Sequence, residues 1–188
     1  MDRPDERNND VNDALTEPLS PSISGFNTAQ GFEDLYRNTF PRVYAYVASL
    51  LRDRSAAEDV TAQAFERAYR KRARFSARRG SPEAWVFGIA RNAALDELRR
   101  RRRGARLAAD PGDVWSPGPE EQAERAFQRE EVRAALAALD PRDRDLVLLK
   151  FAGGLSNAEI ARVLSISESN VGTRLHRSVE KLRKACQS

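Results

Sequence analysis

Residues 155–184 carry the pattern that most limits how this chain can fold: two short apolar runs at helical spacing, joined by a tight turn. In the second run the apolar residues recur at intervals of four, four and three: Val171, Leu175, Val179 and Leu182. This spacing places the four side chains on one face of a helix. Ser156 and Glu159 are spaced as a capping box for the first helix, and Ser167 is placed to cap the second. The stretch predicts a helix-turn-helix, with an ordinary helical hairpin as the alternative.

The same apolar stripe fixes which side chains of the second helix face outward. In a DNA-binding helix-turn-helix, this helix enters the major groove with its N-terminal end first. The outward residues able to contact base edges or phosphates are Ser169, Asn170, Thr173, Arg174, His176 and Arg177. Gly172 interrupts this face and costs the helix ~1 kcal/mol relative to alanine. We interpret His176, the single histidine of the chain, as a groove contact or plain surface rather than a metal ligand.

Helical spacing also runs through the N-terminal half of the chain, and no segment shows the alternating pattern of a half-buried strand. We therefore expect an all-α fold. Residues 32–51 are predicted to form a helix that Pro41 divides into two pieces. Ser55 and Glu58 are predicted to form the capping box of the next helix.

Two further helices carry expectations about the core. A third helix, over residues 82–103 and capped by Ser81, is expected to bury a face made of Trp85, Ile89 and Ala93. A later helix begins at Asp140 and Pro141 and is stopped by Gly153 and Gly154. Its expected buried residues are Leu146 and Leu149, with Phe151 as a further candidate.

Charge divides the chain into four segments. Residues 1–30 have a net charge of −4, residues 31–103 of +8, residues 104–130 of −3 and residues 131–188 of +3. The two basic segments predict a polyanionic partner, with solvated helix faces as the alternative. Residues 1–30 and 104–120 lack apolar periodicity, so the two acidic segments predict a disordered tail and a flexible linker, although a helix is expected to open at residue 124. We therefore expect two small helical domains, 31–103 and 131–188, joined by that linker.

Several classes of function are excluded by composition. One cysteine and one histidine provide neither a disulfide framework nor a zinc cluster. With no catalytic triad, glycine-rich phosphate loop or carboxylate cluster, we expect no enzyme, no cofactor and no small-molecule substrate. The N-terminus is acidic rather than signal-like, and no apolar run approaches the ~20 residues that span a bilayer. These features predict a cytoplasmic protein with no direct membrane insertion.

Three stretches together resemble one family, the extracytoplasmic-function (ECF) group of bacterial sigma factors. They are SAAEDVTAQAFERAYRK, SPEAWVFGIARNAALDELRRRRR and GLSNAEIARVLSISESNVGTRLHRSVEKLRK. Their order and spacing, over about residues 31–103 and 131–185, fit the family better than either half alone. The resemblance implies two helical domains, sigma region 2 and sigma region 4. It also implies a protein that binds core RNA polymerase and directs promoter-specific transcription initiation.

The resemblance assigns roles to particular faces. The clamp coiled coil of the polymerase largest subunit would be bound by Glu58, Asp59, Gln63 and Glu66. The −10 promoter element would be recognised through Arg74, Phe75, Arg78, Arg79, Arg91, Asn92, Arg99 and Arg100. The outward face of the helix-turn-helix would read the −35 element. Further partners implied are the polymerase flap region and an anti-sigma factor. In many relatives Lys or Arg stands where this chain has Gly172.

Two other classes of protein compete with this interpretation. A stand-alone transcription regulator would dimerise through its N-terminal helices and bind a palindromic duplex site unaided. An adaptor would act by protein contacts alone, which leaves the two basic segments unexplained.

Overall fold

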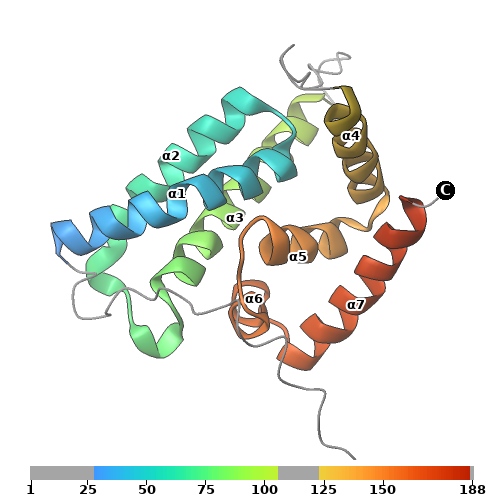
Figure 1. The fold of residues 1–188 in the computed structure, drawn as a ribbon. Helices are drawn as coiled ribbons and strands as arrows, with labels where there is room; N and C mark the ends of the chain where they lie inside the picture. Colours follow the sequence, from blue (N-terminus) through green and yellow to red (C-terminus); the bar gives the residue numbers. More distant parts are fainter. Residues whose placement is uncertain (1–27, 106–122, 187–188) are drawn as a thin grey trace, which may run out of the picture.

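The computed structural model describes residues 28–105 and 123–186 (Figure 1). These residues form seven α-helices and no strand, so the all-α expectation is confirmed. The helices are α1 (Ala29–Leu51), α2 (Arg54–Lys71), α3 (Pro82–Ala105), α4 (Ala123–Ala138), α5 (Pro141–Phe151), α6 (Asn157–Leu164) and α7 (Glu168–Ala185). Two short 3-10 helices, η2 (Arg72–Arg74) and η3 (Ala77–Arg79), connect α2 to α3. Residues 1–27 of the predicted tail and 106–122 of the predicted linker lie outside the described residues, and the described ends of the linker, 104–105 and 123–130, are helical.

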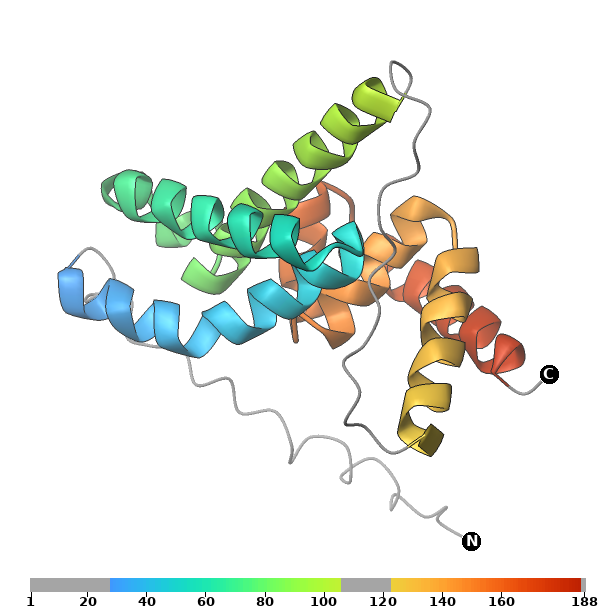
Figure 2. The same ribbon diagram turned by 90° about the horizontal axis from the view of Figure 1, so that it is seen from above.

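Helices α1, α2 and α3 pack against one another as an N-terminal bundle (Figure 2). The predicted break at Pro41 is wrong, because α1 is one helix with the proline inside it. Leu35 before the proline and Val43 and Val47 after it are all buried in the same core. Packing on both sides therefore holds α1 continuous, and Pro41 itself faces solvent.

Helix α2 is capped by Asp53, so the predicted capping box at Ser55 is wrong. The Asp53 Oδ1 atom accepts from the backbone N–H of Ala56 at 2.9 Å. Arg52 follows the last residue of α1 and adopts a left-handed conformation, with a φ of 54°. This one residue makes the turn between α1 and α2. The next helix therefore begins at once at Arg54, and Ser55 falls inside its first turn.

Helix α3 begins at Pro82, and Ser81 caps it by accepting from the N–H of Ala84 at 3.1 Å, as predicted. Its buried face differs from the predicted one. Trp85 and Ile89 are only partly buried, whereas Ala93 is buried as expected. The residues with no exposed surface are Val86, Phe87, Ala90 and Ala94. The shift arises because α3 packs against α1 and α2 on one side and against α6 on another.

Helices α4 to α7 form a C-terminal bundle, in which α7 contacts α4, α5 and α6. The predicted capping box of Ser156 and Glu159 is present, and Ser167 caps α7 through the N–H of Asn170. Phe151 is 66% exposed, so its predicted burial is wrong. It is the last residue of α5 and lies two residues beyond the buried Leu149, on the opposite side of the helix from the core.

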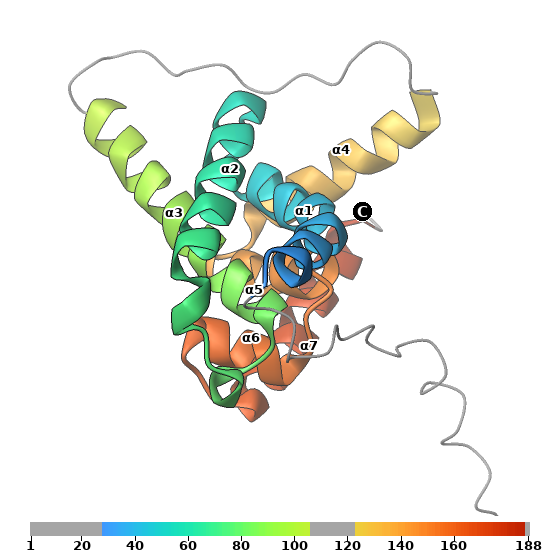
Figure 3. The same ribbon diagram turned by 90° about the vertical axis from the view of Figure 1, so that its left-hand side faces the viewer.

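The two bundles pack directly against each other. Helix α6 lies against α3, and α5 lies against α1. Figure 3 shows the beginning of α3 beside α6 at one end of the molecule. Buried apolar residues of both bundles belong to one core, including Phe87 of α3 and Leu149 of α5. The sequence predicted two domains on a linker, but did not predict this contact between them.

The cap of α2 yields a stability prediction. Asp53→Ala is expected to lower the free energy of unfolding by ~1 kcal/mol, because the first turn of α2 loses its acceptor. Ser55→Ala is the matched control and is expected to stay within roughly 0.5 kcal/mol of wild type. Urea denaturation followed by circular dichroism measures both. Equal losses in the two variants would contradict the assignment of the cap.

The charge of Asp53 adds a pH dependence. The N–H of Ala56 and the guanidinium of Arg101 hold the pKa of the Asp53 carboxyl below its usual range. A lowered folded-state pKa contributes stability at neutral pH that is lost as the pH falls through that pKa. The stability difference between wild type and Asp53→Asn is therefore expected to be constant near neutrality and to shrink under acid conditions.

Candidate nucleic-acid interface

The connection between α2 and α3 is a basic, mostly exposed segment. Arg74 and Arg78 are exposed, as predicted for residues that meet a polyanion. Phe75 is partly buried, with its ring 5.5 Å from that of Trp85. Phe75 of the loop therefore packs against Trp85 of the following helix, α3. Nothing is described for the side chain of Arg79.

Arg91 and Asn92 are neighbours in α3 but occupy different environments. Asn92 is exposed. Arg91 has 23% of its side chain exposed, and its Nε donates to Oδ2 of Asp145 at 2.6 Å. The predicted promoter-reading asparagine thus lies open to solvent, whereas the adjacent arginine already holds a carboxylate of the C-terminal bundle.

The arginine run at the end of α3 is partly neutralised by carboxylates. Arg99 pairs with Asp96 at 2.6 Å. Arg100 and Arg101 both hydrogen-bond Glu97, each at 2.8 Å from Nε. These bonds lower the pKa of the Glu97 carboxyl, with that from Arg100 contributing most.

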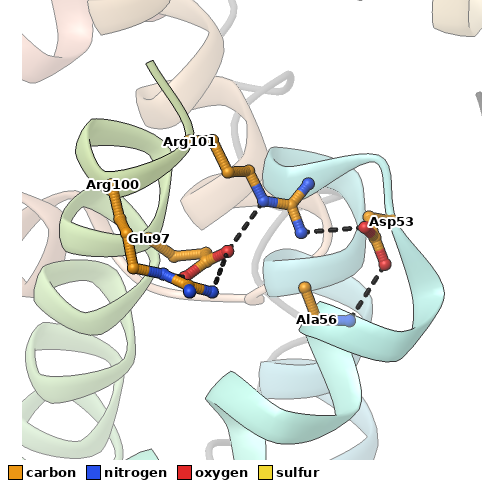
Figure 4. A network of polar contacts seen from close by, with 5 residues as sticks. All are labelled: Asp53, Ala56, Glu97, Arg100 and Arg101. Carbon is orange, nitrogen blue, oxygen red and sulfur yellow. Dashed lines mark hydrogen bonds and ion pairs between the residues drawn. The ribbon is translucent and has the colours of Figure 1, made fainter. Parts of the chain in front are cut away.

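Arg101 also bridges to the cap of α2. Its guanidinium lies between Glu97 and Asp53, which it reaches at 2.8 Å (Figure 4). Arg102 and Arg103 are exposed, and no ion pair joins either of them to another described residue. These two belong to the same run of five arginines as Arg99 and Arg100, the members assigned above to the −10 element. The i,i+3 spacing from Asp96 and Glu97 was the signal that separates the two groups.

The outward face of α7 is arranged largely as predicted. Its exposed side chains are Ser169, Asn170, Thr173, His176 and Arg177. Gly172 stands among them, and a Cβ added there would meet no atom within 4 Å. Arg174 differs, because its guanidinium donates to Oδ1 of Asp143 at 2.6 and 2.9 Å and is only partly exposed. Arg174 therefore links α7 to α5 inside the C-terminal bundle.

The predicted polymerase-facing residues lie together on α2. Glu58, Asp59, Gln63 and Glu66 are all exposed. Glu58 and Glu66 each pair with an arginine of the same helix, at 3.1 and 3.5 Å. Beside them runs a groove between α1 and α2 that sequence reasoning did not identify. Its aromatic lining is Phe32, Tyr36, Phe40, Tyr44, Phe65 and Tyr69.

The described residues contain no group of His, Cys, Asp and Glu side chains arranged to hold a metal ion. Within the same residues, no helix has the length and apolar character to cross a membrane.

Comparison with known proteins identifies the family of the chain. Residues 35–104 match the family model for Sigma-70 region 2, and residues 129–182 match that for Sigma-70 region 4. The ECF RNA polymerase sigma factor SigK of Mycobacterium ulcerans is 30% identical over 156 residues, which is 81% of this chain and 83% of SigK.

Two solved structures share the fold. The first is the sigma factor RpoE of Bartonella quintana in complex with the anti-sigma factor NepR. It has a TM-score of 0.69 and 22% identity, and the match covers 84% of this chain and 98% of RpoE. The second is CnrH in complex with the cytosolic domain of CnrY, with a TM-score of 0.60, 26% identity and coverage of 84% and 88%. With a SigK relative matched over most of its length and both sigma regions present in order, this chain belongs to the ECF sigma factors and directs promoter-specific transcription initiation.

Proposed function

We propose that the N-terminal bundle binds core polymerase and opens the −10 element while α7 of the C-terminal bundle reads the −35 element. The observation that carries this proposal is the exposure of Asn92 on α3, the helix that follows a loop whose Arg74 and Arg78 are also exposed. Capture of an unpaired DNA strand needs cations along its backbone and a polar or stacking contact for a base. The loop offers the exposed cations, and α3 offers the exposed polar side chain.

The −35 contact is proposed for the exposed face of α7. Ser169, Asn170 and Thr173 lie in its first turns, which enter the groove in a helix-turn-helix. His176 and Arg177 follow one turn later and are placed for phosphates or base edges. Arg174 would have to leave Asp143 before it could contact DNA. Its proposed role is therefore to link α7 to α5.

The polymerase contact is proposed for the acidic face of α2 together with the aromatic groove beside it. Tyr36 and Tyr69 are each more than two-fifths exposed, and both line the same aromatic groove. Exposed aromatics next to carboxylates suit a partner helix that carries apolar and basic residues, such as the clamp coiled coil. A contact of the C-terminal bundle with the flap region is proposed from the family alone.

We also propose an anti-sigma factor as a regulatory partner. One solved structure of similar fold is a sigma factor bound to the anti-sigma factor NepR, and another is CnrH bound to the cytosolic domain of CnrY. The protein itself is proposed to perform no bond chemistry and to work in the cytoplasm, where the polymerase is. No cofactor is included in the proposal.

The proposed function is tested by mixing the full-length protein with core RNA polymerase and a library of promoter fragments. Transcripts are expected to start downstream of a shared pair of −35 and −10 sequences. The stand-alone regulator makes the opposite prediction. If the free protein footprints a symmetric duplex site, and no promoter-specific transcript appears with core polymerase, the proposal is wrong.

Asn92→Ala is expected to reduce formation of the open complex about tenfold or more, because one good base contact contributes ~1–3 kcal/mol. Permanganate reactivity of unpaired thymines measures opening, and a gel shift of the holoenzyme measures closed-complex binding, which should change little. Asn38→Ala, at an exposed position of α1, is the matched control. An equal loss in both assays would contradict a role for Asn92 in strand capture.

The arginine run gives a second prediction with an internal control. Arg102→Ala combined with Arg103→Ala is expected to reduce the slope of log affinity against log salt by about 1.8, because each phosphate contact contributes ~0.9. Arg99→Ala combined with Arg100→Ala is expected to have a smaller effect, since those guanidiniums already bind Asp96 and Glu97. The same slope change in both pairs would show that the ion pairs do not decide which arginines are available to DNA.

Gly172 tests whether α7 faces DNA. Gly172→Ala and Gly172→Lys should both stabilise the helix by up to ~1 kcal/mol, and neither meets a steric obstacle at Cβ. Only the lysine adds a cation, so only Gly172→Lys is expected to strengthen −35 binding and to weaken its discrimination between sequences. Competition binding with matched and mismatched duplexes measures both effects. If the two variants behave alike, the position does not face DNA.

A further inference from the structure

One carboxylate of the C-terminal bundle is buried against the N-terminal bundle. Asp145 of α5 is 3% exposed. Its Oδ1 accepts from the hydroxyl of Tyr46 of α1 at 2.7 Å, and its Oδ2 accepts from Nε of Arg91 of α3 at 2.6 Å. Both partners belong to the other bundle. A buried carboxylate is tolerated only when it is paired and hydrogen-bonded, so Asp145 depends on the two bundles being docked.

The Tyr46 hydroxyl is suited to this role. Its ring is fully buried and packs edge-on against Phe87, with the ring centres 5.7 Å apart. Burial raises the pKa of Tyr46 well above its usual value, and the charge of Asp145 raises it further. The phenol therefore remains a hydrogen-bond donor over the whole physiological pH range.

Further polar contacts close the same interface. Arg42 of α1 donates from Nε to the carbonyl of Gly153 at 2.9 Å. At the start of α3, the Ser81 hydroxyl donates to the Glu159 carboxylate of α6. The Arg162 side chain of α6 lies over Gly80, at the end of the basic loop. Helix α6 thus covers the point where the proposed −10 loop meets α3.

This docked arrangement conflicts with simultaneous binding to both promoter elements. The −10 and −35 elements are about 25 base pairs apart, which is roughly 85 Å of B-form DNA at 3.4 Å per base pair. Here the start of α3 and α6 are within hydrogen-bonding distance of each other. The bundles must therefore separate before the chain can span a promoter.

We propose that Asp145 is an intramolecular latch that occupies Arg91 in the resting protein and competes with promoter DNA for it. The inference rests on the proposed function for the role of Arg91 in binding DNA. With the bundles docked, the guanidinium is held by the Asp145 carboxylate. With the bundles apart, Asp145 and Tyr46 return to water, and Arg91 is free for a phosphate of the opened strand.

The chemistry of the pair fits a contact that forms and breaks. A buried ion pair adds little net stability over an apolar contact of the same size. Contacts between domains of one chain are also the usual place for relative motion. A partner that binds only the separated state shifts the equilibrium by its difference in affinity for the two states.

The first test measures the distance between the bundles in the full-length chain. Cys186, the single native cysteine, is exposed at the end of α7, and Arg67→Cys adds a second exposed label site on α2. Pulsed electron paramagnetic resonance on the doubly spin-labelled protein gives the distance distribution. Asp145→Asn is expected to add a population at longer distance. Asp143→Asn, on the same helix but paired only with Arg174 of its own bundle among the described residues, should match wild type.

The second test measures the availability of the −10 face. Fluorescence anisotropy with a random-sequence pool of single-stranded DNA reports binding by the free protein. Asp145→Asn is expected to tighten this binding roughly tenfold, because apparent affinity scales with the fraction of open chain. Tyr46→Phe keeps the ring that packs on Phe87 and removes only the hydroxyl. It should shift the distances and the DNA binding in the same direction, by a smaller amount.

The outcomes separate the latch from the proposed function. Circular dichroism establishes that each variant is folded, and Tyr46→Phe decides the question if Asp145→Asn does not fold. Distances and DNA binding equal to wild type in the folded variants would overturn the latch, even if the wild-type protein directs transcription normally. Absence of promoter-specific transcripts with the wild-type protein would instead refute the proposed function, whatever the label distances.

Discussion

The arrangement of the whole molecule depends on one buried carboxylate. Asp145 extends from the C-terminal bundle into the N-terminal bundle and accepts hydrogen bonds from Tyr46 and Arg91, residues of two different helices. Apolar contacts between α1, α3, α5 and α6 surround it. The carboxylate adds direction to these contacts, because both of its oxygens accept from side chains of the other bundle. Together with the Arg42–Gly153 and Ser81–Glu159 hydrogen bonds, it fixes how the two bundles lie with respect to each other.

Neighbouring carboxylates also decide which arginines a polyanion can use. Among the described residues, many arginines of the basic segments already bind a carboxylate or a backbone carbonyl of the protein. Arg91 and Arg174 link helices, while Arg99 and Arg100 pair with acids one turn earlier. Arg102 and Arg103 project from the end of α3 without such partners among the described residues. Net charge locates a DNA-facing region, but the local balance of charges identifies the residues within it.

Much of the fold and part of the site could be predicted from the sequence. The caps Ser81, Ser156 and Ser167 were correct because each acts within a single turn of its own helix. The cap of α2 was not predicted because Arg52 adopts a left-handed conformation, which is rare for an arginine and which no sequence pattern indicates. Pro41 remains inside α1 because the surrounding core holds both sides in place, which is a tertiary effect.

The sequence by itself determined the helices, the helix-turn-helix with its outward face, and membership of the ECF sigma factors. These depend on apolar periodicity, capping and motif spacing, which act over a few residues. Only the tertiary structure decided that the bundles dock, that α3 is buried on an additional side and that Arg91 is occupied. Arg91 and Asp145 are 54 residues apart in the chain, and Tyr46 and Asp145 are 99 apart. No local pattern records such a pairing, because its energy exists only once the helices have packed and excluded water from the three side chains.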